Sequence, residues 1–541
     1  MSLTRFDLDA ALPNDRPCML YRRCWHAIAA NTVAMRAAGV DPDQVWPPPP
    51  LPPTSGGDGL DSEGGTTSQY DEEKAGGFAE VEGVEVDDSQ HPTGLFREES
   101  MKLVESAVTA PSFETRHGSS HMCEQYAEAL ARCVRSGLTA VQTNDDNAVR
   151  VYERLQAGNE GRLPIRVYLT LPHDELEEQA ATNEHLFPEA GDSGHVEGDD
   201  GKDGPRAPWA GGEGLLSWHR VKLFADGSLG AETAAMRIPY VGTTNTGILI
   251  HDRETLTRKV ALAKDRGFRV EVHAIGDRAL AAVLDAFERA GLTAADRPIV
   301  THCQVVGQDL VSRMEILGAV AAVQPSFVPS DAPVVMKRLS PEVHPSCYPW
   351  RTLMHSGVTC AGGSDSPIET QDPLRGIYDA VLRPNKPTST AVPQSGPNVF
   401  DVDPFLPDER LTLEEAVWMY SAGGAFAAGM EDRVGVIKEG FMADLTILEV
   451  DGGVEALLES PRLILEAKVF QVWVGGWRRW IAPADGAGLS NGDRERAAAS
   501  RGSLSGSGLP GKNGPKRKQG GDNNPWLSRG PGRIGRCRCC S

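Results

Sequence analysis

The sequence predicts an α/β protein built on parallel strands, because short β-rich runs alternate with helical patterns along most of the chain. Such an alternation is typical of parallel sheets and barrels. Seven runs are one fewer than a TIM-like (β/α)8 barrel needs, so we expect such a barrel without its first strand. A doubly wound sheet is the alternative. The runs are residues 138–143, 164–171, 220–225, 268–273, 298–302, 319–324 and 358–362.

The segments between these runs carry helical periodicity. Leu256, Val260 and Ala263 recur on one helical face, and Gly267 follows where such a helix would end. Glycine just past the last turn is a common helix stop. A second helix with the same pattern is predicted from Leu280, Val283, Leu284 and Phe287, before Gly291.

Beyond the last predicted barrel helix, RVGVIKEGFMADLTILEVD and VFQVWVGGWRRW indicate short strands joined by glycine turns. We expect a small β unit there, the remnant of a β-sandwich. The chain then divides into an upstream barrel segment (1–46), a Pro/Gly/acidic insertion (47–76), the barrel (77–432, with an acidic insertion at 173–214), the β unit (433–482) and a basic tail (484–541).

The net charge of −21 resides in two stretches. Residues 54–99 contribute −11 and residues 173–214 contribute −10, so the remainder of the chain is neutral in sum. Segments rich in Gly, Ser, Asp and Glu and poor in aromatics are typically disordered. The acidity therefore indicates disordered insertions and carries no information about the site.

Composition also limits compartment and partners. No apolar run approaches the ~20 residues of a membrane span, and the N-terminal residues do not resemble a signal peptide. The ten cysteines show no secreted disulfide pattern. We therefore expect a cytoplasmic protein that binds a small-molecule substrate and neither membrane nor nucleic acid. The basic run at 516–518 is interpreted as part of a solvated tail, and an oligomer stays open.

Four polar residues lie where apolar runs end: Lys222, His273, His302 and Asp365. Barrel enzymes place their reactive groups at these strand ends. Imidazole is a neutral zinc ligand, and a carboxylate accepts a proton from metal-activated water. We predict His273 and His302 as ligands and Asp365 as general base and further ligand. Each histidine alone would be a structural residue, but their succession on neighbouring strands favours a metal site.

The motifs VKLFADGSLGAETA, VHAIGDRAL, GSDSPIE and AFAAGMEDRVGVIKEGFMADLTIL together resemble the amidohydrolase superfamily, specifically its amidohydrolase-3 (YtcJ-like) branch. LYRRCWHAIAANTVAM and PTGLFREE resemble upstream segments of that branch. The resemblance implies a metal-dependent hydrolase of non-peptide carbon–nitrogen bonds, with one or two divalent ions, zinc by default. In relatives a lysine of the fourth strand can be carboxylated and bridge two ions, and Lys222 occupies the resembling position, which makes it a further candidate ligand.

Four further residues are candidates for substrate binding. His26 resembles a histidine of the family's upstream segment. Gln304 and Gln324 follow predicted strands and are candidates for lining the pocket, while Asp226 lies in the Asp-Gly-Ser sequence after Lys222. The alternative for Asp226 is a plain turn residue.

One expected motif is missing. Relatives carry a His-x-His pair on their first barrel strand, and none of the thirteen histidines here has another histidine two positions away. The resemblance therefore implies that an N-terminal segment with this strand lies outside the sequence. Two hypotheses follow: a hydrolase whose site is completed by that segment, or a truncated, non-catalytic homologue with a binding or structural role.

Overall fold

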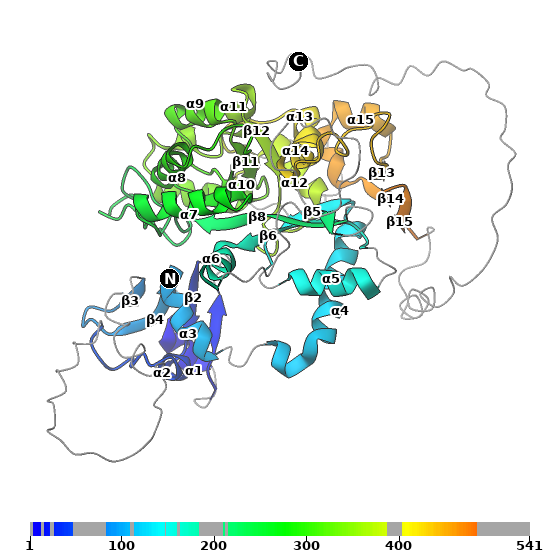
Figure 1. The fold of residues 1–541 in the computed structure, drawn as a ribbon. Coiled ribbons are helices and arrows are strands. Elements are labelled where there is room, and N and C mark those ends of the chain that lie inside the picture. The colour runs from blue at the N-terminus through cyan, green and yellow to red at the C-terminus, as the bar shows by residue number, and fades with distance from the viewer. Residues whose placement is uncertain are drawn as a thin grey trace, which may run out of the picture.

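The structure is a computed structural model that describes residues 4–11, 16–21, 26–46, 83–108, 113–145, 148–158, 163–182, 209–210, 215–386 and 403–483. It comprises a curved parallel sheet with its helices, an N-terminal module and a C-terminal β unit (Figure 1). The predicted disordered stretches at 47–76 and 484–541, and residues 183–208 and 211–214 of the acidic insertion, lie outside the described residues.

All seven predicted runs form strands of one parallel sheet. They are β5 (Ala140–Thr143), β6 (Arg166–Pro172), β8 (Leu216–Phe224), β9 (Arg269–Ala274), β10 (Ile299–His302), β11 (Val320–Val323) and β12 (Thr359–Gly362). Neighbours pair in chain order from β5 to β12, and the short β7 (Trp209–Ala210) pairs antiparallel with β8. A doubly wound sheet would reverse direction at a switch point. The TIM-like barrel prediction is therefore confirmed, and the alternative is wrong.

Helices follow the strands as predicted. Leu256, Val260 and Ala263 are buried on α7 (Arg253–Asp265), and the predicted face of α8 (Asp277–Arg289) is buried as well. The remaining barrel helices are α4 (Phe113–Arg135), α5 (Val149–Gly158), α6 (His173–Thr182), α9 (Gln308–Leu317), α10 (Phe327–Arg338), α11 (Trp350–His355), α12 (Pro373–Leu382), α13 (Leu413–Trp418), a π-helical turn (Met419–Gly423) and α14 (Gly424–Ala428). The short 3-10 turns η3 (His344–Ser346) and η4 (Pro407–Glu409) lie in the connections.

Strands β5 and β12 end the hydrogen-bonded path. In a closed eight-stranded barrel one more strand would pair with both of them. A cavity of about 1250 Å³ lies along this seam and is lined by residues of both edges. Helix α14 covers part of the seam, since Gln142 of β5 and Arg220 of β8 donate hydrogen bonds of 3.0 and 3.1 Å to carbonyls of Gly424 and Ala427.

The N-terminal module has a sheet and a core of its own. Its antiparallel strands are β1 (Met19–Tyr21), β2 (Ala27–Ala30), β3 (Val84–Val86) and β4 (Pro92–Arg97), in the order β1-β2-β4-β3. Helices α1 (Arg5–Ala11), α2 (Thr32–Ala37) and α3 (Met101–Val108), with the turn η2 (Glu98–Ser100), complete the module. Ile28, Met35, Phe96 and Val104 form its centre.

This module changes one predicted boundary. The sequence assigns residues 83–108 to the barrel, whereas β2 pairs directly with β4, so residues 83–108 and 4–46 form one unit. The acidic insertion also differs at its start, because residues 173–182 form helix α6 directly after β6.

The C-terminal β unit consists of β13 (Leu445–Glu449), β14 (Lys468–Val474) and β15 (Trp477–Ile481), all antiparallel, with α15 (Gly453–Glu459) and η6 (Pro461–Leu465) between β13 and β14. A buried ion pair connects it to the barrel. The Arg166 guanidinium donates hydrogen bonds of 2.6 and 2.9 Å to the Asp444 carboxylate, and both side chains are less than 5% exposed.

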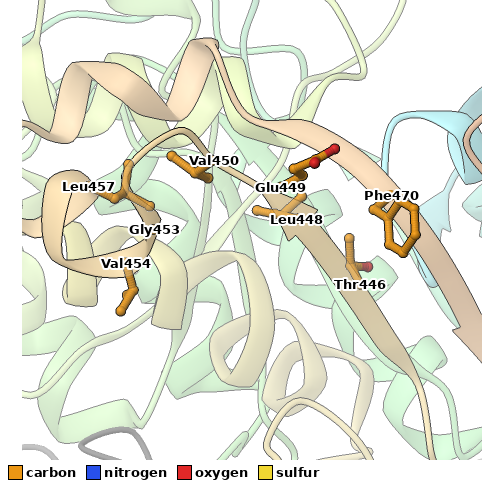
Figure 2. Close-up of a pocket in the computed structure, with 8 residues that line it drawn as sticks. All are labelled: Thr446, Leu448, Glu449, Val450, Gly453, Val454, Leu457 and Phe470. Atoms are coloured by element: carbon orange, nitrogen blue, oxygen red, sulfur yellow. The ribbon is translucent and has the colours of Figure 1, made fainter. Parts of the chain in front are cut away.

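A groove of about 670 Å³ lies between α15 and strands β13 and β14 (Figure 2). Among its lining residues Glu449 alone is ionisable; the others include Leu448, Val454, Leu457 and Phe470. A groove with one carboxylate and no partner for it lacks the groups for acid–base or metal chemistry. Among the described residues, no helix is long and apolar enough to cross a membrane.

Candidate functional site

A cavity of about 250 Å³ lies at the carboxyl ends of the barrel strands, against the N-terminal module. His273 of β9, His302 of β10 and Asp365 after β12 line it, together with His26 from the module. The structure thus brings three of the four predicted metal-site residues to one cavity. Their roles as ligands remain predictions.

His273 and His302 lie side by side because β9 and β10 are paired in register and both residues fall at the strand ends. Their ring centroids are 4.5 Å apart. His273 Nε2 is 3.0 Å from the carbonyl oxygen of Gly227, which can only accept, so Nε2 carries the proton and Nδ1 holds the free lone pair.

Gln324 fixes the tautomer of His302. Its Nε2 donates to the carbonyl of Ala322 at 3.2 Å, which leaves Oε1 to accept from His302 Nδ1 at 2.8 Å. The lone pair of His302 is therefore on Nε2. Gln324, which we predicted as a substrate contact, acts here on a histidine, as groups that orient metal-bound histidines do.

The environment of His302 favours its neutral form. Burial, the neighbouring His273 ring and the Lys222 ammonium all lower the pKa of His302 well below its ordinary value. The backbone at His302 and Asp365 is in the left-handed region, with φ of 84° and 54°. Such backbone in residues other than glycine costs of order 1 kcal/mol and is concentrated at functional sites.

Asp365 is solvent-exposed at the rim of the cavity, in the loop after β12. It also lines the larger seam cavity, so it lies where the two spaces meet. The Asp365 carboxylate interacts electrostatically with His26. Burial opposes protonation of the His26 imidazole, but Glu98, Asp226 and Asp365 together raise the pKa of His26.

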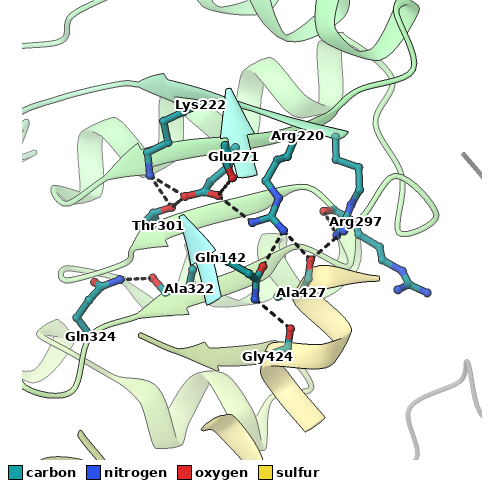
Figure 3. Close-up of polar contacts among 12 residues, drawn as sticks. Gln142, Arg220, Lys222, Glu271, Arg297, Thr301, Ala322, Gln324, Gly424 and Ala427 are labelled. Atoms are coloured by element: carbon teal, nitrogen blue, oxygen red, sulfur yellow. Dashed lines mark hydrogen bonds and ion pairs between the residues drawn. The ribbon is translucent and has the colours of Figure 1, made fainter. Parts of the chain in front are cut away.

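Lys222 lies deeper in the barrel than the histidines and is engaged in an ion pair. Its Nζ is 2.7 Å from Glu271 Oε1 and 3.1 Å from Thr301 Oγ1 (Figure 3). The other carboxylate oxygen of Glu271 accepts from Arg220 at 2.9 Å. Burial alone would raise the pKa of Glu271, but the charges of Lys222 and Arg220 lower it far below its ordinary value. The structure therefore shows an ammonium held between a carboxylate and a hydroxyl.

Asp226 and Gln304 differ in their access to the cavity. The Asp226 carboxylate is fully buried and accepts hydrogen bonds of 2.8 to 3.0 Å from the backbone amides of Ala235, Ile275 and Gly276. It holds the loops behind the cavity wall. Gln304 lines the cavity, and its buried carboxamide oxygen has no hydrogen-bond partner in the described part of the chain.

The sequence did not single out Glu98 or Glu271. Glu98 Oε2 is 2.9 Å from His26 Nδ1, although the two residues are 72 positions apart. Glu271 precedes His273 by two positions, and the alternation of a strand would have placed both side chains on the same face. No comparable sequence signal exists for Glu98, because its position depends on the pairing of β2 with β4.

A second cluster of possible metal ligands, His173, Asp174 and Glu177 on α6, already holds a cation. Lys259 Nζ lies 2.6 Å from Glu177 and 3.6 Å from Asp174, and the Lys259 carbonyl is 2.9 Å from His173 Nε2. This cluster is an ion pair between α6 and α7. The cavity at the strand ends offers two imidazoles with uncommitted nitrogens, and Asp365 lines the same cavity, although the ligand atoms of these three residues do not all lie within 4.8 Å of one another.

Comparison with known proteins identifies the family. The model of the amidohydrolase family matches residues 59–478. The putative amidohydrolase YtcJ of Bacillus subtilis (strain 168) is 31% identical over 480 residues, which cover 86% of this chain and 76% of that protein. The N-substituted formamide deformylase of Arthrobacter pascens is 26% identical over 240 residues, 44% of this chain and 42% of that protein.

Two solved structures share the fold. An uncharacterised metal-dependent hydrolase from Pyrococcus furiosus has a TM-score of 0.52 and 26% identity, covering 81% of this chain and 73% of its own. Another uncharacterised metal-dependent hydrolase, from Pyrococcus horikoshii OT3, has a TM-score of 0.55 and 24% identity, covering 81% of this chain and 72% of its own. With the family match over most of its length and the relative from B. subtilis, this chain belongs to the amidohydrolase family.

Proposed function

We propose that this chain is a metal-dependent hydrolase of non-peptide carbon–nitrogen bonds. The observation that carries the proposal is that His273, His302 and Asp365 line one cavity, and that the hydrogen bonds of the two rings leave His273 Nδ1 and His302 Nε2 uncommitted. Family membership supports hydrolysis, and the bond type rests on the relatives named above.

His273 Nδ1, His302 Nε2 and Asp365 would hold the ion, and zinc is our choice because two imidazoles and a carboxylate are typical zinc donors. When bound, the ion would acidify water and polarise a carbonyl oxygen. Lys222 would join the ligands only if its ion pair with Glu271 broke. Carboxylation would replace its ammonium by an anion beside that carboxylate, so we propose a single ion at the two histidines.

Asp365 is the group we assign to proton transfer. It accepts a proton as water adds to the substrate carbonyl, and it returns that proton to the nitrogen as the carbon–nitrogen bond breaks. The products are a carboxylic acid and an amine, so atoms and protons balance with one water consumed. Its exposure at the rim allows it to exchange protons with solvent after turnover.

The cavity favours a small substrate. Its volume of about 250 Å³ is below that of most drug-sized ligand sites, and part of its wall is formed by Phe327, Val334 and Ile368. Gln304 offers a buried acceptor without a partner, which suits an amide N–H. An N-substituted formamide, a simple amide or a cyclic amide has these features, and one relative is named for deformylation of the first class.

The test is hydrolysis of N-benzylformamide, benzamide and dihydrouracil by zinc-loaded protein, with product amine or acid measured directly. We expect turnover of at least one of the three, and loss of it in Asp365→Asn, whose carboxamide keeps an oxygen for the ion but cannot accept the proton. Asp408→Asn, in the turn η4, is the matched control. Zinc-loaded protein that turns over none of the three, or Asp365→Asn with unchanged turnover, would favour the non-catalytic homologue.

A further inference from the structure

The Asp-Gly-Ser loop after β8 and the carboxylate of Glu98 meet beside the cavity, and neither takes part in the proposed reaction. Glu98 lies at the end of β4, and His26 directly precedes β2. These antiparallel strands pair Ala27 with Arg97. The N-terminal module therefore carries Glu98 and His26 to the barrel together.

Glu98 makes one contact on each side of the junction. Its Oε2 lies 2.9 Å from His26 Nδ1 within the module, and its Oε1 accepts from Thr233 Oγ1 of the barrel at 2.6 Å. Thr233 Oγ1 itself accepts from the Ser228 amide at 3.0 Å, so its hydrogen is committed to Glu98. The carboxylate is 10% exposed and lies behind His26, outside the lining of the cavity.

Gly227 makes room for this carboxylate. A Cβ at Gly227 would lie 2.0 Å from Glu98 Oε1 and 2.2 Å from Thr233 Oγ1, both far inside van der Waals contact. The carbonyl of the same glycine accepts from His273 Nε2. One residue thus allows the module to dock and orients a proposed metal ligand.

The backbone at Glu98 is also unusual. Its φ of 51° is in the left-handed region, which a long side chain rarely adopts. Its amide donates to the His26 carbonyl at 3.3 Å. The fold therefore holds Glu98 in a disfavoured conformation at the point where its carboxylate reaches both His26 and the barrel.

We propose that Glu98 is the positioning residue of His26, the residue predicted above from the family resemblance as a substrate contact. Because the carboxylate accepts from Nδ1, the ring presents Nε2 to the cavity, 5.1 Å between ring centroids from His273. The contact is to the polar amide group of the substrate, next to the carbon that reacts. This assignment rests on the proposed function for its substrate.

Kinetics with N-benzylformamide, or whichever of the three amides turns over, test the assignment. We expect His26→Ala and Glu98→Ala each to lower kcat/KM by about 10- to 100-fold, by analogy with the loss of groups that orient metal-bound histidines. The double variant should be no worse than His26→Ala, since Glu98 acts through His26. Zinc content should stay at the wild-type value in all three.

Two further variants distinguish a loss of His26 positioning from a loss of activity caused by a perturbed N-terminal module. Glu98→Gln keeps an acceptor for Nδ1, while its amide NH2 replaces the oxygen that accepts from Thr233 Oγ1, so it should recover most of the activity lost in Glu98→Ala. Glu85→Ala removes a carboxylate that pairs with Arg97 in the same module, away from the cavity, and should behave as wild type. Additive losses in the double variant, or zinc lost together with activity, would overturn the assignment.

A spectroscopic measurement tests the Glu98–His26 contact even if no amide is hydrolysed. In 15N-histidine-labelled protein, the His26 signals, assigned by their loss in His26→Asn, should show a protonated Nδ1 in wild type. In Glu98→Ala the proton should move toward Nε2. A wild-type His26 that is protonated at Nε2 alone would contradict the Glu98–His26 contact. If the His26 signals are as expected but no amide is hydrolysed, only the proposed function is contradicted.

Discussion

Replacing Glu271 by glutamine should destabilise the barrel strongly. Glu271 is 12% exposed and its two oxygens lie 2.7 Å from Lys222 Nζ and 2.9 Å from Arg220 Nη1 (Figure 3). The two cations are only 7% and 4% exposed. Removing the anion leaves both of them in the barrel interior without a compensating charge.

Breaking one buried ion pair in this way typically costs about 3–5 kcal/mol. The glutamine oxygen still accepts one hydrogen bond, so we expect the lower end, about 3 kcal/mol of unfolding free energy. Glu85→Gln is the matched control, because Glu85 pairs with Arg97 at 2.5 Å but the side chains are 32% and 24% exposed. Exposed pairs of this kind contribute about 0–1 kcal/mol.

Chemical denaturation followed by far-UV circular dichroism measures both variants. A second change, Lys222→Met in the Glu271→Gln background, should restore about 1 kcal/mol or more, because it removes one of the stranded cations. A loss below 1 kcal/mol for Glu271→Gln, or no recovery in the double variant, would show that Lys222 and Glu271 are not paired as the structure has them. Lys222 would then be available for carboxylation.

Three further changes follow from the structure. Gln324→Leu should weaken zinc binding about 10- to 100-fold by releasing the His302 tautomer; chelator competition measures this, and unchanged affinity would count against it. Asp444→Asn should cost about 3–5 kcal/mol in denaturation, because buried Arg166 loses its carboxylate; a cost under 1 kcal/mol would refute the link to the β unit. Burial raises the pKa of Asp379 to about 6 from 3.8, so its contribution to stability is full below about pH 4 and lost as pH rises through 6. At about 1.4 kcal/mol per pKa unit, this contribution amounts to about 3 kcal/mol. It is measured as the difference in unfolding free energy between wild type and Asp379→Asn over this pH range. Identical pH profiles of the two proteins would contradict it.

The barrel was predictable because its signals are local. Each strand is a short apolar run, and parallel strands direct their carboxyl ends to one edge of the sheet. The sequence alone therefore predicts that His273 and His302 are neighbours. The seven strands pair in the order in which they occur along the chain, so counting the predicted runs was enough to predict their order in the sheet.

The parts that sequence reasoning missed depend on distant pairing. His26 and Glu98 meet only because β2 and β4 pair across an intervening segment. Lys222 was correctly placed on its strand, yet its partner Glu271 was not considered, although register alone puts the two side by side. Gln324 lines the larger cavity, and its contact with substrate stays a prediction; its hydrogen bonds to His302 and the Ala322 carbonyl were not expected.

The central claim is that His273 and His302 hold one divalent ion, and metal content with affinity tests it most directly. Purified protein loaded with zinc and freed of excess should retain about one ion per chain, and His273→Ala and His302→Ala should each retain almost none. His344→Ala, whose ring is 3.0 Å from the Leu339 carbonyl outside the cavity, should bind as wild type does. Wild-type protein that retains no zinc, or a His302→Ala variant that keeps a full ion, would contradict the account.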